Sequence, residues 1–514
     1  MRGLRKRIGW RALRLATQAL FWALFLAPLA GFPWFRGTYV ASRLAGIPLT
    51  DPYGAAQAAV AGGLRLAGAA LLGLGLVALV YLLLGRAFCA WVCPLGSLLE
   101  LADRAAERFL SARRAARRGE GRLRPAGPLA RPATDRLHPG GPLPPQASDR
   151  LPLAGRPARL AALPRWTRWA IAIGVLLLTA LTGQALFEWV SPQANLMRSL
   201  LFGFGLQLLI VAAVVAFDLF VLRRGWCRSL CPAGALYSLL GRFAPLRVGH
   251  DRSACDRCGA CVQACPWDGR ETLLETVAGR GRAEANPWTC ANCGDCIDAC
   301  PQGALRFTPA WRVAPAERPV LHPQFSRRQA IGLMGGAVAV AGLSVARPML
   351  AAPEERRLLR PPGALPEAAF VGLCLRCGQC AQACPRAAIR LAGLAGGLGM
   401  GTPYIVPRRV ACDLCKEDGP ACVAVCPTGA LTLEPGAPVR MGVAEVDTER
   451  CIAHMGAVCR TCFVACPLQG TALILEGALR PAVDPAVCTG CGLCEEHCIV
   501  EPAAIAIRPV NEHA

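Results

Sequence analysis

Residues 255–266 read Cys-Asp-Arg-Cys-Gly-Ala-Cys-Val-Gln-Ala-Cys-Pro, which places four cysteines in the order C-x2-C-x2-C-x3-C ahead of a proline. This spacing occurs in four groups, here called the regular quartets: Cys255, Cys258, Cys261 and Cys265; Cys290, Cys293, Cys296 and Cys300; Cys374, Cys377, Cys380 and Cys384; and Cys488, Cys491, Cys494 and Cys498. Two stretched quartets keep a C-x2-C pair and a closing C-x3-C-P around an inserted loop: Cys412, Cys415, Cys422 and Cys426; and Cys451, Cys459, Cys462 and Cys466. Short spacings repeated in this way are typical of metal ligands.

The ligand chemistry of these quartets favours iron–sulfur clusters. Thiolates are soft ligands that suit iron–sulfide, and four of them complete a [4Fe–4S] cluster. Zinc prefers two separated C-x2-C pairs and has no role for a third cysteine at the next step. Disulfide frameworks belong to short secreted chains, whereas this chain has 514 residues and long apolar runs. We therefore expect six [4Fe–4S] clusters, with every quartet cysteine an iron ligand, in α+β domains of the bacterial ferredoxin type.

The regular spacing also suggests which cysteines share a cluster. In bacterial ferredoxins the first three cysteines of a run hold one cluster and the fourth holds its neighbour. One hypothesis therefore exchanges the last cysteine within successive pairs of quartets, although the four C-terminal quartets could pair in a different order. The expected sets are Cys255, Cys258, Cys261 with Cys300; Cys290, Cys293, Cys296 with Cys265; Cys374, Cys377, Cys380 with Cys426; Cys412, Cys415, Cys422 with Cys384; Cys451, Cys459, Cys462 with Cys498; and Cys488, Cys491, Cys494 with Cys466.

Apolar segments in the first half of the chain predict an α-helical membrane domain. Hydrophobic residues make up 54% of the chain. Four stretches approach the length that crosses a bilayer, namely Leu15–Phe32, Leu66–Leu84, Trp169–Phe187 and Leu201–Leu222. Arginines are dense before the first stretch and between the second and third, so the positive-inside rule puts both regions in the cytoplasm. The net charge of +22 has no aromatic platform beside it, and we expect no nucleic-acid partner.

The remaining segments divide the chain into domains. We expect the membrane domain at 1–249, with a flexible Arg- and Pro-rich linker at 111–164, and a cytoplasmic domain with two clusters at 250–310. Residues 311–352 carry Arg327-Arg328 before a modest apolar run, which resembles a twin-arginine export signal. Residues 353–514 would then form a periplasmic domain with four clusters. The signal could be cleaved after Ala346 or kept as a fifth membrane anchor, and an ordinary buried helix is the alternative interpretation.

Four cysteines lie outside the quartets. Cys89 and Cys93 follow the second apolar stretch, Cys227 and Cys231 follow the fourth, and each pair has the pattern C-x3-C-P. Because the pattern occurs twice at equivalent positions, the four thiols are a candidate redox or metal site at the membrane edge. Burial as ordinary small apolar side chains is the alternative.

Several cofactors have no motif in this chain. No histidine lies inside a predicted span and no C-x-x-C-H occurs, so we expect no haem. We also expect no flavin and no NAD, because no dinucleotide fingerprint follows a strand. The polar residues near span ends are Gln184, Glu188, Gln207 and Asp218, and for the two acids an interfacial placement is expected.

Both halves resemble polyferredoxins of periplasmic nitrate reductase systems. The first half resembles the NapH membrane family in three places, namely 47–63, Phe88–Pro94 and Gly225–Pro232, and in the two quartets at 255–300. The second half is similar to the exported NapG ferredoxins at Leu359–Ala364, at Cys377–Cys380, at Gly401–Tyr404 and in the stretched quartet that begins at Cys451. The final Cys498, which no proline follows, also fits that family. The chain departs from these families in one respect, because two subunits that are usually separate proteins are joined in one polypeptide.

The resemblance implies an electron-transfer protein of the bacterial inner membrane with quinol dehydrogenase activity. Quinol would be the electron donor, and a periplasmic reductase, nitrate reductase in particular, or a cytochrome c would be the acceptor. An assembly or maturation factor, a relay for another periplasmic system such as methylamine dehydrogenase, and a structural anchor are the alternatives. No catalytic residues are expected in this chain.

Overall fold

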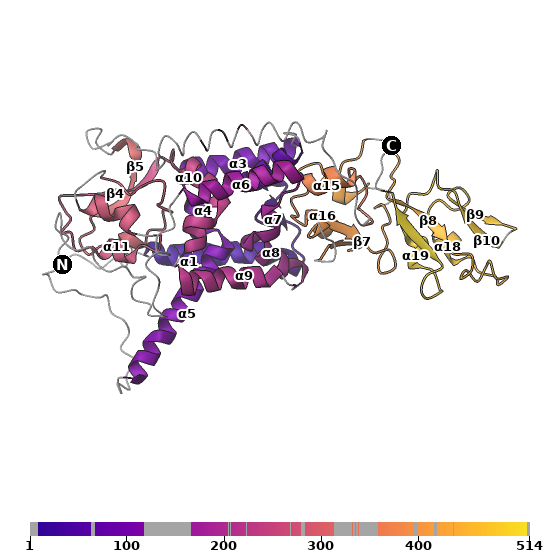
Figure 1. The fold of residues 1–514 in the computed structure, drawn as a ribbon, viewed down its shortest axis with the longest axis horizontal. Helices are drawn as coiled ribbons and strands as arrows, with labels where there is room; N and C mark the ends of the chain where they lie inside the picture. Colours follow the sequence, from indigo (N-terminus) through magenta and orange to yellow (C-terminus); the bar gives the residue numbers. More distant parts are fainter. Residues whose placement is uncertain are drawn as a thin grey trace. The chain divides into compact units, whose positions relative to one another are not determined.

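The computed structural model describes residues 9–62, 67–117, 166–203, 205, 207–222, 224–267, 269–278, 283–312, 332, 335, 338, 358–393, 399–415, 419–434, 436–477 and 479–510 (Figure 1). These residues form two compact units, each built from several stretches of the chain. Unit 1 comprises Met1–Phe25, Gly75–Gly174 and Leu208–Gly336, and unit 2 comprises Leu26–Leu74, Val175–Gln207 and Ala337–Ala514. The twin-arginine pair, the cleavage position after Ala346 and residues 118–164 of the predicted linker lie outside the described residues.

The longer helices of the described residues all lie in the first half of the chain. They are α1 (Trp10–Leu26), α3 (Gly68–Leu84), α5 (Pro94–Arg117), α6 (Thr167–Thr182), α8 (Pro192–Phe202), α9 (Gln207–Ala216) and α10 (Pro232–Gly241). Shorter helical pieces join them: η1 (Ala27–Ala30), α4 (Ala87–Trp91), α7 (Phe187–Val190), and the π-helical turns η3 (Phe217–Val221) and η4 (Trp226–Leu230). Helix α5 continues into the segment that the sequence predicts to be a linker, since it ends at Arg117.

Among the described helices, one passes a length and composition test for crossing a membrane. It is Trp10–Ala30, which has 21 residues and overlaps the first predicted span. The apolar helices Gly68–Leu84, Thr167–Thr182 and Gln207–Val221 are shorter. The four-span domain therefore remains a prediction, although apolar side chains such as Leu20 and Leu72 point outward with 67% and 56% of their surface exposed.

A small α+β domain in unit 1 contains the first two quartets. Strands β4 (Leu246–His250) and β5 (Leu305–Pro309) pair antiparallel, with His250 opposite Leu305. Between them run α11 (Ala260–Ala264), η5 (Arg270–Leu274), α12 (Glu275–Val277) and α13 (Asp295–Asp298), and η6 (Ala310–Arg312) follows β5. Val248, Leu273 and Leu305 form the core together with the cysteines themselves. The cysteines are therefore part of the core of this small domain.

The chain between α1 and α3 is folded, although no helix or strand was predicted there from the sequence. Strands β1 (Phe35–Gly37), β2 (Ala41–Leu44) and β3 (Ile47–Thr50) form an antiparallel sheet in the order β1-β2-β3. Helix α2 (Pro52–Ala61) begins where the Asp51 carboxylate accepts the backbone N–H groups of Tyr53 and Gly54, at 3.0 and 2.9 Å. Such a side-chain cap satisfies N–H groups that have no partner inside the helix.

The C-terminal part of unit 2 repeats the α+β pattern twice. The first repeat has α15 (Glu367–Leu373), α16 (Gln379–Ala383), α17 (Ala421–Ala424) and the antiparallel strands β6 (Ile389–Leu391) and β7 (Pro403–Ile405). The second has α18 (Thr461–Ala465), α19 (Leu493–Glu496) and the antiparallel pairs β8 (Gly442–Val446) with β11 (Ile505–Pro509), and β9 (Leu473–Glu476) with β10 (Arg480–Val483).

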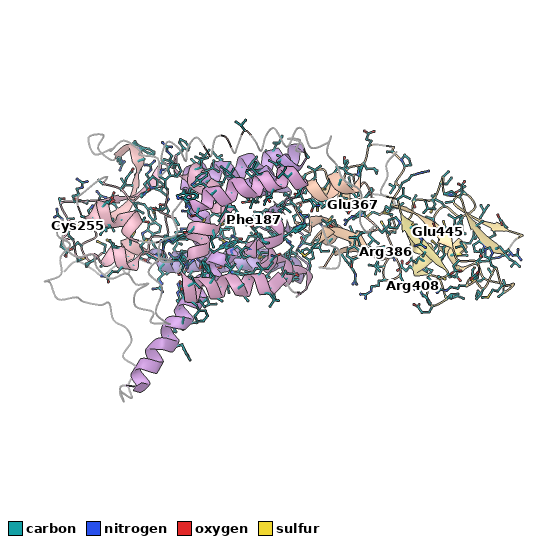
Figure 2. The ribbon with its side chains drawn as sticks, in the orientation of Figure 1. Phe187, Cys255, Glu367, Arg386, Arg408 and Glu445 are labelled. Atoms are coloured by element: carbon teal, nitrogen blue, oxygen red, sulfur yellow. The ribbon has the colours of Figure 1, made fainter. Side chains whose placement is uncertain are left out.

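Arginine side chains join the two repeats (Figure 2). Arg386 Nη2 lies 3.0 Å from both carboxylate oxygens of Glu496. Arg408 Nη1 donates to the carbonyl oxygens of Glu495 and Cys498, at 3.0 and 2.7 Å. The two repeats are thereby held together through the segment that carries the last quartet.

Candidate iron–sulfur sites

The six quartets share one local conformation. In each, the third cysteine lies in a short helix (α11, α13, α16, α17, α18 or α19), and the fourth follows that helix. In five quartets the residue before the second cysteine has positive φ: Arg257 (59°), Asn292 (48°), Arg376 (54°), Leu414 (60°) and Gly490 (70°). A left-handed residue at this position turns the backbone so that successive thiols face the same side. The non-glycine residues there are held in a conformation that L-amino acids seldom adopt.

In unit 1 the thiols of the two quartets surround two cavities. One cavity is lined by Cys255, Cys258, Cys261 and Cys300, and the other by Cys265, Cys290, Cys293 and Cys296. The fourth cysteine of each quartet therefore lies with the first three of the other.

The C-terminal quartets are arranged in the same manner. One cavity is lined by Cys374, Cys377, Cys380 and Cys426, and another by Cys466, Cys488, Cys491 and Cys494. The thiols of Cys412, Cys415 and Cys422 lie near Cys384, close enough to affect one another's charge. Cys451 and Cys459 lie near Cys462, while Cys498 borders the apolar cluster that includes Cys462. The fourth cysteines are therefore exchanged between the third and fourth quartets, and between the fifth and sixth.

The electrostatics of these thiols fit a bound cation. Burial, and then the neighbouring Cys300, Cys255 and Cys258, raise the pKa of Cys261 to about 12. Burial also raises the pKa of Cys377 to about 12, with Cys374 and Cys426 adding to the rise against an opposing backbone N–H group at Gln379. Such thiols ionise readily only when a positive charge compensates them, and iron would supply it.

Backbone N–H groups point at several sulfurs. Arg257, Leu414 and Leu431 donate to the Sγ atoms of Cys255, Cys412 and Cys426, each at 3.4 Å, and Ala504 donates to Cys498 Sγ at 3.4 Å. Hydrogen bonds to ligand sulfurs are among the factors that set the potential of an iron–sulfur cluster. When bound in these cavities, a [4Fe–4S] cluster supplies reversible one-electron exchange.

In the described part of the chain, no three His, Cys, Asp or Glu side chains converge as ligands of a single metal ion would. This finding does not conflict with cluster binding. Each thiolate of a cubane binds a different iron atom, so its four sulfurs stand farther apart than the ligands of one ion.

The four cysteines of the C-x3-C-P motifs also come together. Cys89 lies in α4, Cys227 lies in η4, and Cys231 Sγ accepts the N–H of Gly234 at the start of α10. Burial, followed by Cys89, raises the pKa of Cys93 to about 12, and Cys231 contributes to the rise. Cys89 and Cys227 pack against Trp267 and Cys293, so these two thiols adjoin the cavity of the second quartet.

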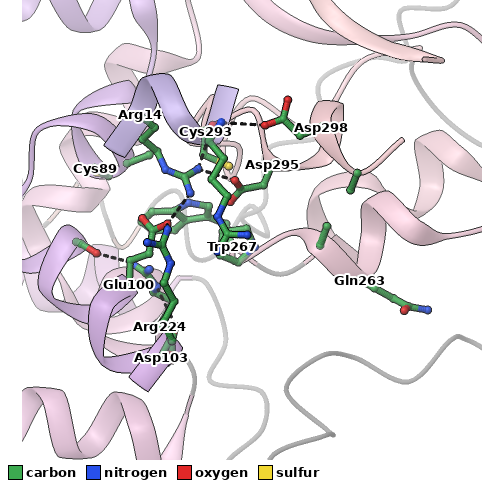
Figure 3. Close-up of a pocket in the computed structure, with 17 residues that line it drawn as sticks. Arg14, Cys89, Glu100, Asp103, Arg224, Gln263, Trp267, Cys293, Asp295 and Asp298 are labelled. Carbon is green, nitrogen blue, oxygen red and sulfur yellow. Dashed lines mark hydrogen bonds and ion pairs between the residues drawn. The ribbon is translucent and has the colours of Figure 1, made fainter. Parts of the chain in front are cut away.

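A cavity of about 380 Å³ beside these thiols contains a buried charge network that the sequence did not indicate (Figure 3). Arg14 lies 2.7 Å from Glu100 Oε1 and 2.9 Å from Asp295 Oδ1, and it donates to the carbonyl of Cys293 at 3.0 Å. Only 3% of the Arg14 side chain is exposed. From the sequence, Arg14 is interpreted only as one of the arginines that indicate membrane topology. Its position one turn before Gln18, on the same face of α1, was the available signal.

In unit 2, Glu188 is buried. Its side chain is 1% exposed and lies 3.7 Å from Arg198 Nη2 and 3.5 Å from Gln57 Nε2. Burial raises the pKa of Glu188 to about 7, although Arg198 opposes the rise. In unit 1, Asp218 is buried as well and accepts the N–H of Trp226 at 2.9 Å. Both acids are therefore buried inside their units, and their placement at a membrane interface stays a prediction.

Removing iron should unfold the quartet domains. Their strands form isolated pairs, and cysteines supply much of their cores, so metal binding and folding are coupled. After oxidation of the clusters and chelation of the iron, we expect residues 246–309 and 358–510 to become sensitive to protease. The protein should keep most of its helical circular dichroism, because helices such as α1 and α3 lie outside these residues. Protease-resistant, iron-free C-terminal fragments would contradict this expectation.

Three family models match the chain. Residues 66–114 and 204–249 match a model described as a 4Fe-4S binding domain, and these residues include both C-x3-C-P motifs. Residues 247–301 match a 4Fe-4S dicluster domain, and residues 372–392 match a further 4Fe-4S binding domain. The expectation of ferredoxin-type [4Fe–4S] domains is thereby confirmed.

Several characterised proteins are similar to this chain, whereas no solved structure matches it. Ferredoxin-type protein NapG of Escherichia coli K12 is 41% identical over 189 residues, which are 34% of this chain and 81% of that protein. Methylamine utilization ferredoxin-type protein MauM of Paracoccus denitrificans is 41% identical over 198 residues, 36% of this chain and 88% of that protein. MauN of Methylorubrum extorquens, named in the same way, is 34% identical over 268 residues, 51% of this chain and 77% of that protein. The chain therefore belongs to the family of iron–sulfur electron-transfer proteins that includes the ferredoxin-type proteins NapG, MauM and MauN.

Proposed function

We propose that this protein is a membrane-bound electron relay that takes electrons from quinol and delivers them to a periplasmic reductase, nitrate reductase in the leading case. The observation that carries the proposal is the gathering of the quartet cysteines around cavities in both units, with four thiols at each of four cavities. The iron ligands would be the 24 quartet cysteines, six quartets of four among 28 cysteines. The C-x3-C-P thiols Cys89, Cys93, Cys227 and Cys231 are proposed as an additional redox or metal site.

The proposed location is the bacterial inner membrane, with residues 250–310 in the cytoplasm and 353–514 in the periplasm. Support comes from the outward apolar side chains of the long helices: Leu79 on α3, Leu178 on α6 and Leu209 on α9 have 52%, 51% and 63% of their surface exposed. Apolar patches of this kind need a covering, and lipid covers apolar helices without cost. The arginines around these helices support the orientation.

A second candidate function is a relay in a methylamine-oxidising system. The observation that favours it is that relatives named for methylamine utilization match the chain, one of them over 51% of its length. A maturation factor, which would supply electrons only to activate a partner's metal centre, remains the third candidate.

The relay can be tested anaerobically in native membranes. Adding a reduced quinol analogue should produce EPR signals from several reduced clusters within the turnover time of the acceptor. Signals that develop with dithionite but never with quinol would contradict the relay. Adding nitrate reductase together with nitrate should reoxidise the reduced clusters if the first candidate is right. Adding methylamine dehydrogenase together with methylamine to oxidised membranes should instead reduce the clusters if the second candidate is right. A pre-activated partner that turns over normally without this protein would favour maturation.

A further inference from the structure

Within unit 2, helices α15 and α16 of the C-terminal part pack on the folded segments 35–62 and 183–202. The apolar contact joins Val40, Ala58 and Ala194 from those segments to Leu375 and Cys377. Leu375, which follows the first cysteine of the third quartet, is 2% exposed. The Cys374 set is therefore the C-terminal set that adjoins these segments.

Polar groups complete this contact. Arg376 Nη1 donates to the carbonyl of Ala185 at 3.4 Å, and its guanidinium lies 5.6 Å above the centre of the Trp189 ring. The N–H of Gly37 in β1 donates to Gln382 Oε1, and Arg43 Nη1 donates to the carbonyl of Ala424 at 3.3 Å. Arg376 is 1% exposed. A buried cation with directed partners is characteristic of a specific contact rather than a loose one.

Two glycines allow close packing at this contact, one against a backbone carbonyl and one against an aromatic ring. A Cβ atom on Gly372 in α15 would lie 2.6 Å from the carbonyl oxygen of Gly183 and 3.4 Å from Ala61 Cβ. A Cβ atom on Gly378 would lie 2.3 Å from the Phe202 ring. The atoms that a methyl group on Gly372 would meet belong to segments 35–62 and 183–202, not to the C-terminal part.

We propose that this face is a docking interface which holds a ferredoxin-type domain, here residues 358–510, on segments 35–62 and 183–202 without help from the covalent connection at 313–357. The partner it fits is a two-repeat iron–sulfur domain that presents a glycine in its first helix and an arginine between its first two cysteines. The two segments and the C-terminal domain must then lie on the same side of the membrane. The inference rests on packing and is independent of the electron donor and acceptor.

The test cuts the connection in the intact protein. A site-specific protease sequence is inserted between Ala352 and Pro353, the full-length protein is purified in detergent with a C-terminal affinity tag, and the chain is then cleaved. The N-terminal fragment should remain on the affinity resin with the tagged fragment. Its release on cleavage would overturn the proposal.

A variant pair locates the contact. Gly372→Ala favours the helical state of α15, because alanine is the better helix former. The added methyl group crowds the Gly183 carbonyl, so retention of the N-terminal fragment on the resin should weaken on the order of tenfold or more. Ala368→Gly, on the exposed side of α15, is the matched control and should retain like the parent. Iron content, measured in both, reports that the C-terminal domain is intact.

Ala61→Leu crowds the same contact from α2 and should also release the N-terminal fragment. This second variant tests the contact even if Gly372→Ala loses iron, because Ala61 lies outside the C-terminal domain. Retention equal to the parent protein in both crowding variants would overturn the proposal.

Discussion

Replacing Cys300 with serine should remove the cluster of the Cys255 set and leave the cluster of its own quartet in place. Cys300 lines the cavity of Cys255, Cys258 and Cys261, although it follows Cys296 in the chain. The loss is expected to be about four irons per protein, since each set holds one [4Fe–4S] cluster. Iron analysis gives the count. Alkylation followed by mass spectrometry identifies the released thiols, which should be Cys255, Cys258 and Cys261.

Cys265→Ser is the matched variant. Cys265 lines the cavity of Cys290, Cys293 and Cys296, so its replacement should release those thiols instead. If each variant released the cysteines of its own quartet, the exchange of ligands would be wrong. In a relay, both variants should also abolish the EPR signal of the corresponding cluster under quinol.

Replacing Arg14 with alanine should destabilise unit 1 by about 3–5 kcal/mol, because it leaves partners of a buried ion pair without their cation. Glu100 and Asp295 lie 2.7 and 2.9 Å from the guanidinium. The side chain joins α1 to α5 and to the quartet domain, so its loss should also speed the release of the first two clusters. The measurement is the thermal midpoint of the detergent-solubilised protein, followed by the visible absorbance of the clusters.

Arg508→Ala is the control for Arg14→Ala. Arg508 Nε lies 2.8 Å from Glu445 Oε2, but the two side chains are 72% and 61% exposed. An exposed pair contributes about 0–1 kcal/mol, so this variant should melt like the parent. Equal thermal midpoints for the two variants would show that the Arg14 network does not stabilise the unit.

The grouping of the thiols could be predicted from spacing because it depends on local geometry. A left-handed residue such as Arg257 and a short helix around Cys261 place three thiols on one side, and the sequence between them is too short to allow much else. The fourth thiol is turned away from its own quartet for the same reason. Its role as an iron ligand remains a prediction.

Features that depend on distant residues could not be predicted. The burial of Glu188 depends on Gln57 and Arg198, and the network of Arg14 depends on Glu100 and Asp295. A reading of hydropathy and charge along the sequence does not include such distant partners. It therefore predicts an interfacial position for Glu188 and treats Arg14 as a signal of membrane topology. The folding of residues 35–61 into β1–β3 and α2 was missed for a similar reason. Its short strands gain stability from one another and from the segments packed on them.

The exchange of fourth cysteines limits how such chains can change over generations. A single quartet copied elsewhere in a gene would bring only three thiols to one cavity, and its fourth thiol would have no second cavity to complete. In this chain the fourth thiols that complete the cavity of another quartet include Cys265, Cys300, Cys426 and Cys466. Duplication, deletion or recombination inside a pair of quartets would therefore leave incomplete sets, whereas a break between pairs would leave every set whole. Chains of this kind should lengthen or shorten by two quartets at a time.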